Sequence, residues 1–87
     1  SKVDTEFYIS WTEGAMEFDA MPFPLLIARL SRCYNVDIQI ASKELETMKF
    51  TGVIFRNKPL DFALDIIHRV SDVKFEKKGE TILVKKQ

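Results

Sequence analysis

The sequence predicts an α+β fold: two duplicated strand–helix–strand units, with two helices packed against small sheets and a C-terminal β-hairpin. Two observations lead to this prediction. A shift of 37 residues aligns two halves of the chain without a gap and places Phe18 on Phe55 and Pro22 on Pro59. Near the end, Lys78-Gly79 separates two alternating segments, which is typical of a hairpin turn. We therefore expect residues 16–40 and 53–77 to fold as two copies of one unit.

The 87 residues are expected to form a single domain. Residues 1–10 are a linker or a front strand, and residues 11–41 form the first unit. Residues 42–49 connect the units, and residues 50–87 form the second unit with its closing hairpin. The front strand, where present, would cover residues 5–11.

Each unit opens with a short alternating strand, over residues 15–18 and 53–55. A proline follows and opens a helix, because its missing N–H has no partner in a first helical turn. The helices are predicted over residues 23–34 and 60–71, where apolar residues recur every three or four positions. The remaining strands are predicted at residues 36–40, 73–77 and 81–84.

The connector contains a predicted short helix or turn. Ser42 is placed to cap it through its hydroxyl group. Leu45 and Met48 are expected to turn inward onto the core.

Composition excludes several classes of protein. Thirteen Lys and Arg balance thirteen Asp and Glu, so the net charge is zero, and the basic surface on which nucleic-acid binding depends is not expected. The longest apolar run is far shorter than the roughly 20 residues of a membrane span, and the polar N-terminal residues do not form a signal peptide. The chain lacks an initiator Met, as a fragment of a longer protein would. We expect no direct membrane contact from it.

The residues that most often perform catalysis are few. Cys33 is the sole cysteine and His68 the sole histidine, too few for a zinc site without carboxylates. Helical spacing places Cys33 on the core face, equivalent to Val70, as a buried and inert thiol. His68 is expected to be solvated near the end of its helix. No catalytic, metal or cofactor-binding residue is predicted, so the chain is not expected to be an enzyme.

Four motifs follow one another along the chain. They are Trp11 and Gly14 with Phe18, the helical stretch 22–36 with Arg32-Cys33-Tyr34, Phe50-Thr51-Gly52 with Pro59-Leu60, and Gly79 with Ile82. Their order over residues 11–84 resembles the C-terminal domain of FecR-type anti-sigma factors, in the form found in Bacteroidetes. Phe23-Pro24 departs from that family's pattern, in which a leucine and then an acidic residue are more frequent.

The resemblance implies a periplasmic signal-receiving domain of a single-pass inner-membrane protein. Such a domain binds the signalling domain of a TonB-dependent outer-membrane transporter. A cytoplasmic part of the protein, outside this chain, holds an extracytoplasmic-function sigma factor. The resemblance implies protein binding without turnover and without a cofactor.

Three alternatives stay open. The short signalling domain of transporters or secretins is similar in plan, although the Trp11 and Gly14 motif and the Arg32-Cys33-Tyr34 helix end favour the anti-sigma form. A small glycan- or ligand-binding module would expose Tyr8 and Trp11 side by side. A small enzyme would place His68 and an acid in a solvent-exposed pocket.

Two surfaces are candidates for the partner. One is an apolar patch formed by Leu25, Phe62 and Ile66, which lie away from the centres of the apolar helix faces. The opposing expectation is that sheets on both sides of the helices bury these side chains. The other candidate is an exposed strand edge over residues 81–84, represented by Thr81 and Leu83, to which an extended segment could add.

Overall fold

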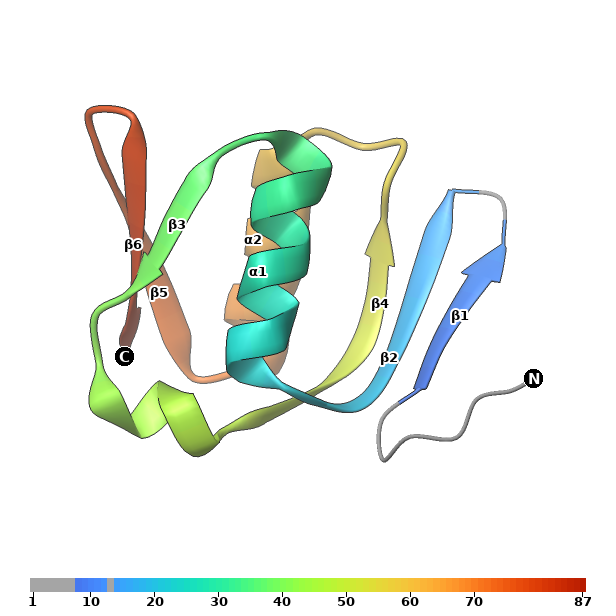
Figure 1. The fold of residues 1–87 in the computed structure, drawn as a ribbon, viewed down its shortest axis with the longest axis horizontal. Coiled ribbons are helices and arrows are strands. Elements are labelled where there is room, and N and C mark those ends of the chain that lie inside the picture. Colours follow the sequence, from blue (N-terminus) through green and yellow to red (C-terminus); the bar gives the residue numbers. More distant parts are fainter. Residues whose placement is uncertain (1–7, 13) are drawn as a thin grey trace.

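Two helices lie between two three-stranded sheets (Figure 1). The computed structural model describes residues 8–12 and 14–87. The elements in chain order are β1 (Tyr8–Thr12), β2 (Ala15–Pro22), α1 (Phe23–Tyr34), β3 (Asp37–Ile40), the 3-10 helix η1 (Lys43–Thr47), β4 (Lys49–Phe55), α2 (Leu60–Val70), β5 (Val73–Lys78) and β6 (Thr81–Lys86). The predicted α+β class with a C-terminal hairpin is confirmed. Within the described ranges, no helix is long and apolar enough to cross a membrane.

The first sheet has the order β1-β2-β4, with antiparallel neighbours. Its inner face carries the buried side chains of Met16 and Phe18 from β2 and of Phe50 and Ile54 from β4. The alternation in β2 places Glu17 on the opposite, exposed face. The front strand is present over Tyr8–Thr12, and the part of its prediction at residues 5–7 lies outside the described residues.

The second sheet has the order β3-β6-β5, so the last strand lies in its centre. β6 runs antiparallel to β5, to which the hairpin joins it, and parallel to β3 from the first unit. Val73 and Val84 are buried against the helices from this side. The second strands of the two units therefore belong to one sheet without touching, because β6 lies between them.

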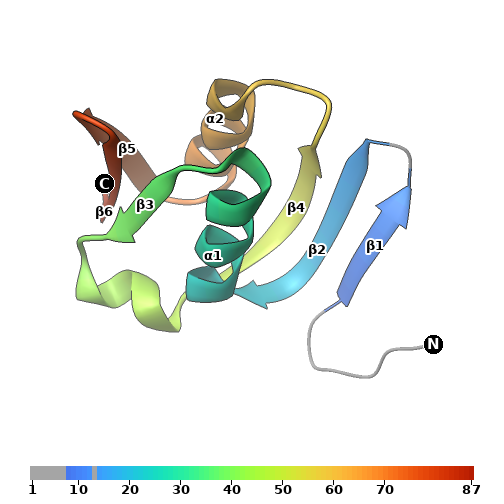
Figure 2. The ribbon, with the colours of Figure 1, turned by 45° about the horizontal axis from the view of Figure 1, so that its top comes forward.

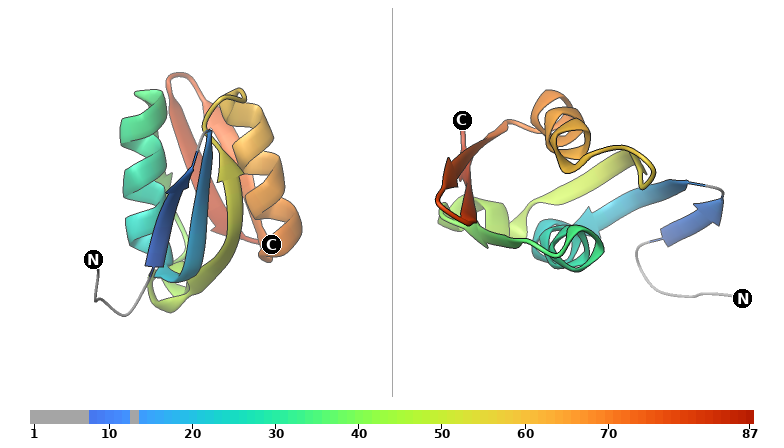
Figure 3. Two further views of the ribbon diagram at one scale, coloured as in Figure 1. Left: turned by 90° about the vertical axis from the view of Figure 1, so that its right-hand side faces the viewer. Right: turned by 90° about the horizontal axis from the view of Figure 1, so that it is seen from above.

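The two helices begin 37 residues apart, at Phe23 and Leu60, as the repeat predicts. Equivalent positions are buried in pairs, for example Leu30 with Ile67. The helices run in opposite directions along the molecule (Figure 1), and the end-on views place them on opposite sides of β4 (Figure 3). The predicted side-by-side packing of the helices is therefore wrong, because β4 lies between them (Figure 3).

The prediction that the opening strands of the two units match residue by residue is wrong. Phe18 is 2% exposed, whereas its expected equivalent Phe55 is 38% exposed. In β2 the pairing register with β4 shifts between Phe18 and Met21, and Ala20 adopts a left-handed backbone with φ of 56°. A bulge of this kind changes which residues face inward, because side chains alternate along a strand. The second unit has a turn in place of this bulge.

The connector crosses from the second sheet to the first beside the start of α1 (Figure 2). There Phe23 N–H donates to the Met48 carbonyl at 2.8 Å. Leu45 is buried and Met48 packs against the core, as predicted. The predicted capping role of Ser42 is wrong, because its hydroxyl oxygen instead accepts the Lys86 N–H at 3.0 Å and ties the connector to β6.

The bulge predicts a stabilising substitution. Ala20→Gly should raise the free energy of unfolding by about 0.5–1 kcal/mol, because glycine adopts a positive φ without the steric penalty of a Cβ atom. Thermal and urea unfolding would measure the change. Ala28→Gly, at an exposed position of α1, is the matched control and should destabilise by about 1 kcal/mol. Equal losses in both variants would show that the left-handed backbone at Ala20 carries no strain.

Candidate functional site

An exposed apolar stripe runs along α2 and continues onto the end of β4. Phe62, Ile66 and Val70 follow at intervals of four residues, which places them side by side on one helix. Phe62 is 43% exposed and Val70 is 56% exposed, while Ile66 is half-buried. The Phe55 ring meets the Phe62 ring edge-to-face, with centroids 6.2 Å apart. We call these four residues the α2 stripe.

The aromatic end of the stripe adjoins the loop before α2, and Tyr34 of α1 bonds to the backbone of this loop. The Tyr34 hydroxyl lies 3.3 Å from the Phe55 carbonyl oxygen and 3.2 Å from the Lys58 carbonyl oxygen, and donates to this pair. The pKa of that hydroxyl is raised, mainly because burial disfavours the phenolate; Cys33 adds to the rise and Arg56 opposes it. The phenol therefore keeps its proton and its donor role. The Lys58 ammonium lies 5.7 Å from the Phe62 ring centroid, in cation–π range.

The charges beside the stripe are largely paired with one another. Arg69 Nε donates to Asp65 Oδ2 at 2.8 Å, and Lys77 Nζ donates to Asp61 Oδ1 at 3.0 Å. Exposed pairs of this type contribute about 0–1 kcal/mol each, so they add little to stability. They leave an apolar surface with balanced charges around it, which suits contact with another protein.

The prediction that Leu25 belongs to the same patch as Phe62 is wrong. Leu25 is 45% exposed, so it is not buried by a sheet. However, Leu25 and Phe62 each lie in the first turn of their helix, and the two helices run in opposite directions on opposite sides of β4 (Figures 1 and 3). The two residues therefore lie on opposite sides of β4 and at opposite ends of the pair of helices, and only Ile66 joins Phe62.

The prediction of a free strand edge at residues 81–84 is also wrong. Thr81 pairs with Asp37 of β3 on one side and with Lys78 of β5 on the other, and Leu83 pairs with Gln39 and Glu76. The backbone of β6 is therefore engaged on both sides, and no further strand can add to it. Thr81 and Leu83 are half-buried, in the middle of their sheet.

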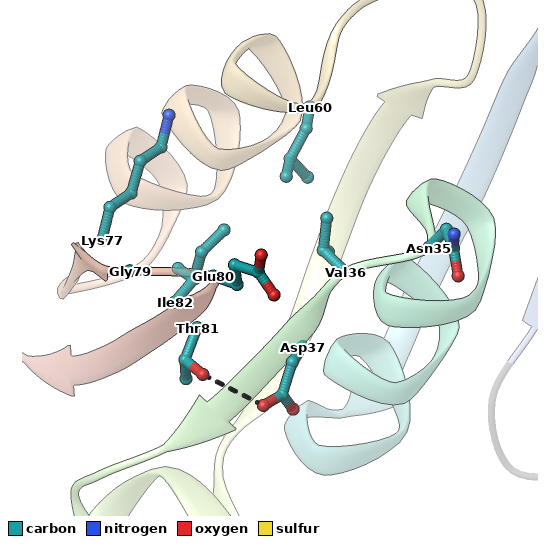
Figure 4. A pocket seen from close by; sticks show the side chains of 9 residues that line it. All are labelled: Asn35, Val36, Asp37, Leu60, Lys77, Gly79, Glu80, Thr81 and Ile82. Carbon is teal, nitrogen blue, oxygen red and sulfur yellow. Dashed lines mark hydrogen bonds between the residues drawn. The ribbon is translucent and has the colours of Figure 1, made fainter.

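A cleft of about 710 Å³ opens where the two units meet the hairpin (Figure 4). It lies at the end of α1, the start of α2 and the turn between β5 and β6. Val36, just before β3, Leu60 of α2 and Ile82 of β6 point into it (Figure 4). Glu80 in the hairpin turn extends toward these three side chains, whereas the Asp37 side chain points away from them and accepts from the Thr81 hydroxyl (Figure 4).

The predicted burial of Cys33 is wrong, because the thiol is exposed. Val70, its equivalent in the repeat, is exposed as well. The two positions are therefore equivalent, but both are exposed and not buried as predicted. Both residues lie in the last turn of their helix, and the buried residues of each helix stop one turn earlier, at Leu30 and Ile67.

His68 lines a cavity of about 350 Å³ together with Asp61 and Asp65, an arrangement that could suggest catalysis. However, His68 Nδ1 lies 2.7 Å from the Val73 carbonyl oxygen, and both carboxylates bind the basic side chains already described. The ring is thus oriented by backbone rather than by an acid, unlike the nucleophile–base–acid chains of hydrolases. Among the described residues, no group of three or more His, Cys, Asp and Glu side chains could hold a metal ion.

Phe55 and Val70 were not among the predicted site residues. The repeat assigned Phe55 to the buried face with Phe18, and Val70 to the apolar stripe of α2. The sequence does indicate that Val70 shares a helix face with Phe62 and Ile66, since these three residues follow at intervals of four. The exposure of Tyr8 and Trp11, which would indicate a glycan-binding module, lies outside the described side chains.

Comparison with known proteins agrees with the fold. The family model described as the C-terminal part of FecR matches residues 15–84. Two crystal structures of a protein assigned as an anti-sigma factor from Parabacteroides distasonis ATCC 8503, at 2.50 and 1.65 Å, each superpose with a TM-score of 0.76 at 24% identity. Each match covers 86% of this chain but only 35% of the other, so the chain spans about a third of their length. No curated protein sequence matches the chain.

Proposed function

Because this chain belongs to the family of FecR C-terminal domains, we propose that it is the periplasmic signal-receiving domain of a transmembrane anti-sigma factor. In this proposal its partner is the signalling domain of a TonB-dependent outer-membrane transporter. Binding of the transporter would be relayed through a membrane span to a cytoplasmic part that holds an extracytoplasmic-function sigma factor. Both the span and the cytoplasmic part lie outside this chain.

The observation that carries the proposal is the α2 stripe. Two aromatic rings and two aliphatic side chains gather at one solvent-facing surface of an 87-residue domain, although such a domain has few apolar residues to spare from its core. Contiguous exposed apolar surface is typical of protein interaction sites. The chain has no net charge, so affinity would come from apolar contact more than from long-range electrostatic attraction.

Phe62 is the expected centre of the contact. Phe62→Ala should weaken transporter binding by about 30-fold, because removal of a central aromatic side chain typically costs 2 kcal/mol or more of binding free energy. Isothermal titration calorimetry would measure this, using the purified signalling domains of the TonB-dependent transporters from the same organism. The melting temperature should stay near that of the wild type, because Phe62 lies outside the core.

Leu25→Ala is the matched control for this experiment. Leu25 is exposed to a similar degree but belongs to α1, on the other side of β4, so its truncation should leave the dissociation constant unchanged. A complex that Phe62→Ala leaves intact would place the contact elsewhere on the domain. A wild-type chain that binds none of the transporter domains would refute the proposed partner itself.

A further inference from the structure

We propose that β1 is the contact strand of a homodimer and pairs antiparallel with β1 of a second copy of this chain. β1 (Tyr8–Thr12) is the outermost strand of the first sheet, and β2 is its partner there (Figures 1 and 2). The two three-stranded sheets would then join into one, in the order β4-β2-β1-β1-β2-β4. β4, which carries Phe55 of the α2 stripe, forms the opposite edge of the sheet, so the proposed contact does not depend on a transporter.

The other edge strands carry features that hinder the addition of a further strand. β3 has four residues and begins with Asp37, and β4 lies between the two helices (Figure 3). β5 is largely charged, through Lys74, Glu76, Lys77 and Lys78. Short length, charged residues and cover by helices are the usual protection of a strand edge against further pairing.

β1 has none of these features among its own residues. Its sequence, Tyr-Ile-Ser-Trp-Thr, contains no charged residue, proline or glycine. All of its residues except the serine are aromatic or β-branched and favour strands. An uncharged edge strand of this composition is a ready template for another strand, which indicates that β1 is covered in the assembled protein.

The pairing of β1 with β2 determines which backbone groups of β1 are directed to its free edge. Thr12 and Ala15 are paired and flank a two-residue loop, and such a loop is closed by a hydrogen-bonded pair. Hydrogen-bonded and non-hydrogen-bonded pairs then alternate along antiparallel strands. Ser10 therefore bonds to β2, whereas the N–H and C=O groups of Ile9 and Trp11 point to the free edge.

These free groups are arranged symmetrically about Ser10, which makes the edge complementary to a second copy of itself. In an antiparallel pair with a two-fold axis at Ser10, Ile9 lies opposite Trp11 of the second copy, and the two residues exchange their outward hydrogen bonds. Tyr8 then lies opposite Thr12 of the second copy. Both pairs combine an aromatic with a β-branched residue, which is a favourable combination across strands. A two-fold contact of this kind closes at two copies.

The charges of the first sheet do not oppose this pairing. β1 is neutral, and the acidic residues of the first sheet, Glu17 and Asp19, belong to β2. Neighbouring strands are about 4.8 Å apart, so the carboxylates of the two copies would be separated by three strand spacings, or about 14 Å. That distance exceeds the screening length of about 8 Å at physiological ionic strength.

Self-association of the purified chain tests the proposal. Sedimentation equilibrium should give a weight-average mass that rises from 10.1 kDa toward twice this value as the concentration increases from about 10 µM to about 1 mM. Ile9→Pro removes an outward N–H but no donor to β2, and proline is tolerated at such positions of edge strands. It should weaken the association by about tenfold or more, because each copy loses one hydrogen-bond donor to the other. Lys43→Pro, at the exposed first position of η1, is the matched control and should associate as the wild type does.

Cross-linking tests the register without a change in the backbone. The two Ser10 residues would form a non-hydrogen-bonded pair with Cα atoms about 4.5 Å apart, within the roughly 4.4–6.8 Å that a disulfide spans. The exposed thiol of Cys33 is first removed by Cys33→Ser. In that background Ser10→Cys should form a disulfide-linked dimer under mild oxidation, whereas Thr47→Cys, at an exposed position of η1, should stay largely monomeric.

Three results would overturn the proposal. A mass that stays at 10.1 kDa up to about 1 mM would leave the edge of β1 to a strand of another protein. Association of Ile9→Pro as strong as that of the wild type would place the contact between copies elsewhere on the domain. Cross-linking of Ser10→Cys no faster than that of Thr47→Cys would exclude the antiparallel register about Ser10.

Discussion

Leu30→Ala and Ile67→Ala should each lower the free energy of unfolding by about 2–5 kcal/mol. Both side chains are 0% exposed and occupy equivalent positions in α1 and α2. Truncation removes buried methyl groups and leaves a cavity that a closely packed core can fill only in part. A domain of this size has a total stability of about 5–10 kcal/mol, so either variant would be close to unfolding at 37 °C.

Urea denaturation monitored by circular dichroism would measure these losses. Leu25→Ala is the control, because it makes the same chemical change in the same helix at an exposed position, and its cost should stay below about 1 kcal/mol. A loss at Leu30 no larger than the loss at Leu25 would mean that the inner face of α1 is assigned incorrectly.

Gly52→Ala should destabilise the domain by about 1–3 kcal/mol, through overpacking. A Cβ atom at this position would lie 2.8 Å from Cζ of Phe50, which is two residues earlier on the same face of β4. The ring cannot swing away easily, because Phe50 is fully buried and packs edge-to-face against Phe18 at a centroid distance of 6.0 Å. The backbone of β4 or the ring must therefore shift.

A double-mutant cycle separates this clash from a general intolerance of side chains in β4. Phe50→Leu shortens the side chain that the new methyl group would meet. Gly52→Ala should then cost at least 0.5 kcal/mol less in the Phe50→Leu background than in the wild type, which is the usual lower range of coupling between contacting residues. Additive losses would show that the Phe50 ring is not what excludes a side chain at Gly52.

The helices could be predicted closely from the sequence because their signals are local. A proline marks each start, and the apolar period identifies the buried face over three turns. The predicted range 23–34 agrees with the structure, and the range 60–71 differs by one residue at its end. Alternation, which is also a property of neighbouring residues, predicted where the strands lie but not their full length: β2 covers Ala15–Pro22 and β4 Lys49–Phe55, against predictions of 15–18 and 53–55.

The neighbours of each strand were not predictable in this way. Nothing within residues 81–84 indicates that β6 lies between β3 and β5, because that placement depends on contacts with residues about 44 positions earlier. The bulge at Ala20 escaped prediction for a related reason. Alanine gives no local sign of a positive φ, and the conformation is supported from another strand, where the Thr51 hydroxyl oxygen accepts the Ala20 N–H at 3.0 Å.

The candidate site was predictable in part. Phe62 and Ile66 were found because they depart from the apolar face of α2, and this departure is visible in the spacing alone. The repeat predicts a buried Phe55 because it equates this residue with Phe18, and that equivalence fails because the bulge of β2 has no counterpart in β4. The cleft brings Val36, Leu60 and Ile82 together from three distant parts of the chain, and no local pattern relates them.

The central position of β6 has a consequence for the order in which this domain can assemble. During synthesis, which begins at the N-terminus, β2 and β4 can pair early, and both helices can form on that sheet. β3 and β5 have no common partner until residues 81–86 become available, so the second sheet cannot form before then. Completion of the second sheet must close a long loop, which is a slow step. Completion of the second sheet should therefore be a late event in the folding of this domain.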